Sequence, residues 1–325
     1  MMKRYSLVFV FCFLAFSGCK QDRHSGHALN LSSAPDSLEL FAEGIISTPL
    51  NERDIAISSQ GDEIFYSLFS YDNSIRTLIH IQKKGKSWKD PEIAWFAGKF
   101  FDLEPSFAPD GSKLYFISNR PMSETDNTAD HNIWFVAKND TGWSNPQPLP
   151  EIINSGSDEF YPSVSANGNL YFTAHYPDAL GGEDIYMSNF SNDHYLKPER
   201  LDTGVNSVNW EFNAYVSPDE KYLLFSSFGR KDDLGGGDLY ISIKDDSGKW
   251  TAARNLGPGI NSEKLDYCPF IDWPRNAFYF TSNRSGDVPD LITSIKEVEA
   301  LAERSLNGMG NIYWVNISVL GLENP

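Results

Sequence analysis

Cysteine is scarce in this sequence of 325 residues, which contains only three. Two of them, Cys12 and Cys19, fall in an N-terminal stretch that we expect to be processed during export, so only Cys268 belongs to the folded part. A single cysteine excludes an intrachain disulfide, even in an oxidising compartment. Stability must therefore come from the hydrophobic core, and a chain of this length can bury a large one.

Basic residues are also fewer than acidic ones: the sequence contains 27 Lys and Arg but 44 Asp and Glu, which gives a formal net charge of −17. A surface of this sign repels the phosphates of nucleic acids and anionic lipid surfaces. We therefore expect no nucleic-acid partner, and membrane contact only through a lipid anchor. The sequence also lacks G-x-S-x-G, H-E-x-x-H, phosphate-loop and dinucleotide-binding motifs, so nothing in it signals catalysis.

The N-terminus predicts an exported protein. Lys3 and Arg4 precede an apolar run too short to span a bilayer, and the segment Ser17-Gly18-Cys19 follows it. This segment resembles a bacterial lipobox, which implies residues 1–18 as a lipoprotein signal peptide and a lipid on Cys19; a plain signal peptide cut nearby is the alternative. Loss of the two basic residues takes the net charge from −17 to −19. We expect an outer-membrane lipoprotein of the cell envelope that faces the periplasm or the cell surface.

Residues 19–37 are polar and without periodicity, which predicts a flexible tether, and residues 38–325 form the domain. This domain contains five copies of one pattern: an apolar run, a tight turn, an aromatic-rich run and a third strand, repeated every 50 to 57 residues. Four short antiparallel strands per copy are typical of a propeller blade. The last copy lacks its fourth strand, and the segment Leu38–Ile46 matches that strand. We therefore predict an all-β, five-bladed propeller that an N-terminal strand closes.

The turns and the runs after them resemble the WD40-like propeller repeats of the TolB type. The residues that carry the resemblance are Ala108-Pro109-Asp110-Gly111 with Ser118-Asn119-Arg120, Ser217-Pro218-Asp219, and Thr281-Ser282-Asn283-Arg284. The resemblance implies the fold but no single function, because such propellers serve as binding scaffolds and as parts of enzymes. A six-bladed ring, as in TolB, is the alternative.

One segment departs from the repeat. Residues 287–306 show helical spacing, and we predict one amphipathic helix there, with Asp287 as its cap, Pro289 in its first turn and Gly308 at its end. We expect it to cover the rim of the propeller; gating of the central pocket is the alternative.

An acidic residue stands three positions before each inner strand opens. The five acids are Glu52, Asp102, Glu159, Glu211 and Asp266. Chain direction places them on one face, together with Arg120, His175 and Arg284 at the ends of the second strands. A ring of carboxylates would attract Ca²⁺, a hydroxyl-rich ligand or a cationic ligand. Alternatively, each acid binds backbone N–H groups of its loop or pairs with Arg120 or Arg284, because buried charges are normally paired.

We expect a monomeric, non-catalytic binding or scaffolding module for a glycan or a cell-envelope protein. The alternative is a carbohydrate-active enzyme, a polysaccharide lyase or glycoside hydrolase, in which His175 and Glu159 act as the catalytic groups. His175 attracts attention because it interrupts the repeated Ser-Asn-Arg pattern. Four aromatic residues also recur just after the third strand, and we expect them to pack between blades rather than to bind sugars: Trp88, Trp143, Tyr195 and Trp250.

Overall fold

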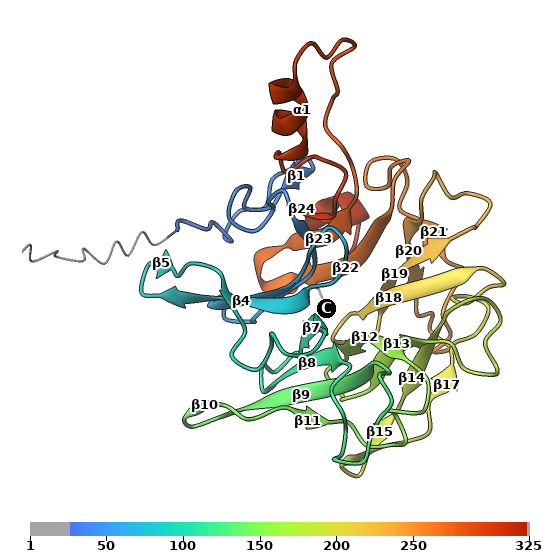
Figure 1. Cartoon of the computed structure of the whole chain (residues 1–325). Coiled ribbons are helices and arrows are strands. Elements are labelled where there is room, and N and C mark those ends of the chain that lie inside the picture. The colour runs from blue at the N-terminus through green and yellow to red at the C-terminus, as the bar shows by residue number, and fades with distance from the viewer. Residues whose placement is uncertain (1–26, 324–325) are drawn as a thin grey trace, which may run out of the picture.

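The computed structural model describes residues 27–323 and confirms the five-bladed propeller (Figure 1). Blade one comprises β2 (Asn51–Ile57), β3 (Glu63–Phe69), β4 (Arg76–Lys84) and β6 (Glu92–Ile93), with the short β5 (Ser87–Trp88) beside β4. Blade two comprises β7 (Asp102–Phe107), β8 (Lys113–Ser118), β9 (Asn132–Asn139) and β11 (Gln147–Pro148), with β10 (Gly142–Trp143). In both blades the first strand lies at the centre of the ring.

The other three blades repeat this order. Blade three comprises β12 (Glu159–Val164), β13 (Leu170–Ala174), β14 (Asp184–Ser188) and β17 (Glu199–Arg200), and carries a small hairpin, β15 (Phe190–Ser191) and β16 (His194–Tyr195). Blade four comprises β18 (Trp210–Val216), β19 (Tyr222–Phe228), β20 (Asp238–Ile243) and β21 (Arg254–Asn255). Blade five comprises β22 (Asp266–Asp272), β23 (Ala277–Ser282) and β24 (Asn311–Asn316). Its first turn contains η1 (Trp273–Arg275), and η2 (Ile317–Leu320) follows its last strand.

The ring is closed as predicted, by an N-terminal strand. β1 (Glu39–Leu40) pairs antiparallel with β24, so that Glu39 faces Trp314 and Leu40 faces Tyr313. Blade five therefore takes its fourth strand from the start of the chain, which leaves the ring without an unpaired gap.

Residues 27–37, which the sequence assigned to the tether, lie on the propeller. His27 pairs with Trp88, Leu31 and Ala34 are buried, and the Asn316 N–H donates to the Pro35 carbonyl over 2.7 Å. The signal peptide and Cys19 lie outside the described residues. Among residues 27–323, no helix is long and apolar enough to cross a membrane.

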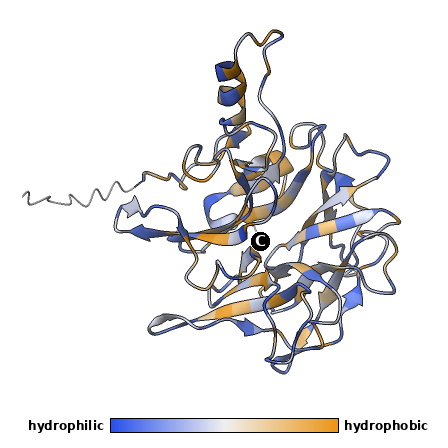
Figure 2. Ribbon diagram, viewed as in Figure 1, coloured by the Kyte–Doolittle hydropathy of each residue, from blue (hydrophilic) through white to orange (hydrophobic). Residues whose placement is uncertain are grey.

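The four recurring aromatic residues pack between blades, as predicted. The Trp143 indole donates to Glu63 of blade one over 3.2 Å, and Trp250 meets Tyr171 of blade three edge to face. Likewise, the Tyr195 hydroxyl lies 3.4 Å from that of Tyr115 in blade two. Trp88 is buried, its indole donates to the Leu29 carbonyl over 3.2 Å, and it belongs to a hydrophobic cluster that includes residues of blades one and five. Figure 2 shows hydrophobic segments, coloured orange, along the strands of the blades.

The inserted segment contains a helix, but the predicted bounds and role were wrong. α1 spans only Ile295–Ala302, and its cap is Ser294, whose hydroxyl accepts from the Glu297 N–H over 3.3 Å. None of its residues is buried, and it extends outward from blade five (Figure 1). Ile295 is 72% exposed and Val298 48%, so the helix does not cover the rim.

Candidate functional site

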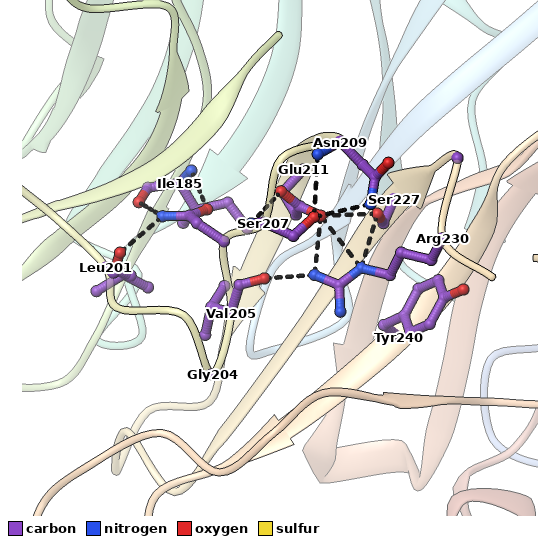
Figure 3. Close-up of polar contacts among 12 residues, drawn as sticks. Ile185, Leu201, Gly204, Val205, Ser207, Asn209, Glu211, Ser227, Arg230 and Tyr240 are labelled. Atoms are coloured by element: carbon purple, nitrogen blue, oxygen red, sulfur yellow. Dashed lines mark hydrogen bonds and ion pairs between the residues drawn. The ribbon is translucent and has the colours of Figure 1, made fainter. Parts of the chain in front are cut away.

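The five repeated acids are fully buried, and each closes the loop that leads from the preceding blade into its own inner strand. Blade four shows the arrangement in full (Figure 3). The Ser207 N–H and hydroxyl donate to Glu211 over 2.8 and 2.7 Å, and Arg230 donates to the same carboxylate over 2.8 Å. Arg230 also donates to the Val205 carbonyl. We call the buried acid together with the groups that hold it a clasp; in this blade these groups are the loop serine and an arginine. It joins adjacent blades and matches the structural alternative for the acids.

Blades two and five also pair the clasp acid with an arginine: Arg120 pairs with Asp102, and Arg284 pairs with Asp266 over 3.0 Å. In blade five the Ser262 N–H and hydroxyl donate to Asp266 as well. Burial raises the pKa of Asp102 and of Asp266, against the pull of the arginine in each case. The Asn before each clasp serine is structural too: Asn154, Asn206 and Asn261 each accept from and donate to the backbone of the third strand.

Blades one and three have no arginine in the clasp. Glu52 is bound by the N–H and hydroxyl of Thr48, and Glu159 by Ser155 and by the Tyr176 hydroxyl at 2.8 Å. Burial raises the pKa of both carboxyls to about 7, although these hydrogen bonds oppose it. In both blades the clasp acid therefore gains a proton near neutral pH.

His175 is not the counterpart of the arginines, and this part of the sequence interpretation was wrong by one position. Glu159 faces Ala174 in the sheet just as Asp102 faces Ser118, so Tyr176 stands where Arg120 stands in blade two. The His175 ring is exposed and contacts the Gly182 carbonyl. Within residues 27–323, no hydrogen bond or ion pair joins His175 to Glu159, and the buried Glu159 offers no surface to a substrate.

The clasps also argue against a metal ring. Among the described residues, no group of three or more His, Cys, Asp or Glu is arranged to hold a metal ion. Each acid is enclosed in its own clasp, so the five carboxylates do not converge on the axis. The five clasp acids therefore do not form one shared Ca²⁺ site.

A different ring of residues faces the axis, and the sequence interpretation missed it. Two positions after each clasp acid, the inner strand bulges and the residue adopts a left-handed backbone, with φ between 50° and 59°. Bulges re-aim side chains, and they do so here at the centre of the propeller. We call these residues the axial ring: Asp54, Glu104, Tyr161, Asn213 and Cys268.

Arg53 ties the axial ring together. Its guanidinium donates to Asp54 over 2.8 Å and to Glu104 over 3.1 Å, and lies 4.8 Å from the centre of the Tyr267 ring. Glu104 also accepts from the Tyr161 N–H over 2.6 Å. Burial and then the neighbouring Asp54 raise the pKa of Glu104, against the pull of Arg53. The charge of Arg53 is therefore already shared between two carboxylates.

Above the axial ring, on the face where the inner strands begin, lies a cavity of about 240 Å³. We call it the axial mouth. Its lining combines charged, polar and aromatic side chains from all five blades: Arg53, Glu104, Phe160, Thr173, Glu183, Phe212, Asn213, Leu265 and Tyr267. Small polar–aromatic pockets of this kind are typical of binding sites.

Glycines shape the wall of this face. A Cβ on Gly181 would stand 1.6 Å from the Asn209 carbonyl oxygen, and one on Gly182 would stand 2.2 Å from the Trp210 ring. The glycine loops of blades three and four thus let the start of the third strand pack on the next blade. This close packing places Glu183 at the axial mouth.

The opposite face has a second cavity on the axis, of about 420 Å³, lined by turn residues such as Pro109, Pro218 and Trp273. Its charged lining residues are already bonded: Asp219 accepts from Ser217 and Lys221, and Asp272 pairs with Arg275. Between the two cavities, at the level of Pro105, Pro162 and Pro269, lies a smaller space of about 10 Å³. This is room for about one water molecule.

No protein-family model and no curated protein matches this sequence. Solved structures similar to the chain include a protein of unknown function from Dyadobacter fermentans (14% identity, 77% of this chain and 80% of that one, TM-score 0.45). Another is puromycin hydrolase, at 12% identity and a TM-score of 0.41, with 78% of this chain matching 39% of the enzyme. A third is oligogalacturonate lyase in complex with manganese (11% identity, 82% of this chain and 65% of that one, TM-score 0.39). Sequence identities and TM-scores this low give no information about the function of this chain.

Proposed function

We propose that this protein is a non-catalytic binding module of the cell envelope, held at a membrane by a lipid on Cys19, and that it binds a glycan at the axial mouth. The observation that carries the proposal is the composition of this cavity. Half-buried rings of Phe160 and Phe212 stand beside the carboxylate of Glu183 and the amide of Asn213. Aromatic faces with a few fixed polar groups suit a ligand that is apolar on its ring faces and hydroxyl-rich at its edge.

The symmetry of the fold also favours binding over catalysis. General acid–base chemistry needs two groups with different pKa values within reach of one substrate. The clasp acids are buried in separate blades, and the pair named for the enzymatic alternative, His175 and Glu159, is divided between the surface and the interior. We therefore keep glycan binding, and not glycan cleavage, as the proposed function.

The test is a glycan-array and calorimetry screen of the mature protein in detergent, with Phe212→Ala as the variant. We expect Phe212→Ala to weaken binding of any glycan hit by about tenfold or more, because one buried aromatic contact is worth 1–2 kcal/mol. The matched control is Tyr71→Ala, an aromatic residue that is 59% exposed in the loop after β3, on the same face but outside the mouth. Equal binding by both variants would place the ligand elsewhere.

The lipid anchor has its own test. We expect the wild-type protein to partition into membranes and the Cys19→Ala protein to remain in the aqueous fraction, since two acyl chains on one residue suffice for stable anchoring. A Cys19→Ala protein that still sediments with membranes would contradict the anchor.

A further inference from the structure

Glu183 stands out among the carboxylates of the axial mouth because its side chain has no partner. Within residues 27–323, no hydrogen bond or ion pair reaches its carboxylate, whereas Glu104 and Asp54 are both held by Arg53. Burial raises the pKa of Glu183, His175 and Arg53 pull it down, and Asp158 opposes them. A half-buried carboxylate without a partner is costly, and the usual remedy is an opposite charge.

The surroundings of Glu183 show what kind of charge fits. Three aromatic side chains from three different blades line the same cavity: Phe160, Phe212 and Tyr267. Aromatic faces attract cations and accept the flat faces of rings. The Asn213 carbonyl oxygen accepts from Cys268 over 3.5 Å, which leaves the amide N–H₂ of Asn213 to donate to a ligand oxygen.

The size of the cavity limits the ligand group to one ring. At about 240 Å³ the mouth is smaller than pockets for drug-sized ligands, which begin at roughly 300 Å³. The space below it on the axis is about 10 Å³, which is room for about one water molecule and not for a sugar ring. A longer chain must therefore insert a single terminal unit and run outward across the face.

From these contacts we infer that the terminal unit is an amino sugar with a free ammonium group, which pairs with Glu183 while its ring lies against the aromatic side chains and a hydroxyl accepts from Asn213. This inference rests on the proposed glycan-binding function and narrows it to cationic glycan ends. The same ammonium chemistry occurs on a lysine side chain, but a flexible lysine would use neither the flat aromatic surfaces nor the amide of Asn213.

The experiment titrates the mature protein with three matched sugars, glucosamine, glucose and N-acetylglucosamine, by NMR or calorimetry at about pH 6, where the amine is protonated. We expect glucosamine to bind about tenfold more tightly than the two neutral sugars, and Glu183→Gln to remove that preference. The matched control is Glu263→Gln, which removes a carboxylate that is 82% exposed on the same face and outside the mouth. It should leave the preference unchanged.

The outcomes separate this inference from the proposed function. If the three sugars bind equally and Glu183→Gln changes nothing while Phe212→Ala still weakens binding, the amino-sugar inference is overturned and glycan binding stands. If Nα-acetyl-lysine amide binds in a Glu183-dependent manner and no sugar does, both are overturned in favour of a protein segment. If no probe binds at tens of millimolar, the inference is overturned as well.

Discussion

Blades two, four and five differ from blades one and three in how they neutralise the same buried acid. In the first group an arginine supplies the charge: Arg120, Arg230 and Arg284 each reach the clasp acid of their own blade. In the second group no Lys or Arg among the described residues pairs with the acid, and burial raises the pKa of Glu52 and Glu159 to about 7. The buried acid of the repeat is thus neutralised in two ways, by an ion pair with arginine or by protonation of the carboxylate.

Blade three shows how the second solution works. The Tyr176 hydroxyl lies 2.8 Å from Glu159 and 3.2 Å from the Ile153 carbonyl. Arg230 makes the equivalent two contacts in blade four, to Glu211 and to the Val205 carbonyl. A protonated Glu159 can donate to the tyrosine, which then donates to the carbonyl, so every polar atom is satisfied without a charge. In blade three a tyrosine therefore takes the place that arginine has in blade four, whereas Glu52 of blade one is held by Thr48.

The largest expected effect comes from removal of an arginine. Arg230→Ala leaves Glu211 buried without its cation, which should lower the free energy of unfolding by about 3–5 kcal/mol. For a domain of this size we expect a loss of roughly 10 °C in the melting temperature, measured by calorimetry. The control is His175→Ala in blade three, which removes an exposed side chain and should cost under about 1 kcal/mol. Similar losses of stability in both variants would show that the Arg230–Glu211 pair contributes no more to stability than an exposed side chain.

Protonation of Glu52 and Glu159 predicts that the free energy of unfolding depends on pH. An unfolded glutamate has a pKa near 4.5, and the folded Glu52 and Glu159 have values of about 7, so the folded protein holds the extra protons between these pH values. The free energy of unfolding should therefore fall as pH rises from about 4.5 to 7, by up to about 3 kcal/mol per carboxyl. Above the folded pKa this contribution levels off.

The double variant Glu52→Gln/Glu159→Gln isolates this contribution, because other buried acids such as Glu104 add to the same slope. Chemical unfolding at several pH values should give a shallower slope for the variant than for the wild type, with the greatest gain in relative stability above pH 7. Parallel curves for the two proteins would show that folding raises the pKa of neither carboxyl. Asp102→Asn is the contrasting variant: it removes the partner of Arg120 and should destabilise the protein at every pH tested.

The sequence was sufficient for the parts of the fold that repeat. The five apolar–turn–aromatic patterns, the missing last strand and the recurring Trp143 and Trp250 all depend on spacing, and the structure confirms each of them. The helix start was also readable: Ser294 directly before α1 and Glu297 in its first turn form a capping-box pattern, but Asp287 and Pro289 placed the predicted start too early.

The axial ring could not be predicted in the same way. Its residues lie at the same offset from the clasp acids and share a left-handed backbone. Their side chains differ in chemical type, as Asp54, Tyr161 and Cys268 show. A bulge is set by pairing between strands, and no residue type requires it. The clasp partner in blade three was missed for a related reason. His175 is one position from Tyr176, and only the register of β12 and β13 shows which one faces Glu159.

The smallest effect tests the tyrosine directly. Tyr176→Phe removes one hydroxyl and leaves Glu159 and the Ile153 carbonyl short of a partner, which should cost about 1–2 kcal/mol in urea unfolding. The matched control is Tyr279→Phe in blade five, because the Tyr279 hydroxyl is buried and has no hydrogen-bond partner among the described residues. Its removal should be neutral or slightly stabilising. If both variants lose the same stability, the hydrogen bonds of the Tyr176 hydroxyl do not stabilise the protein. Glu159 would then be neutral in blade three without any contribution from Tyr176, the residue that stands where arginine stands in blade two.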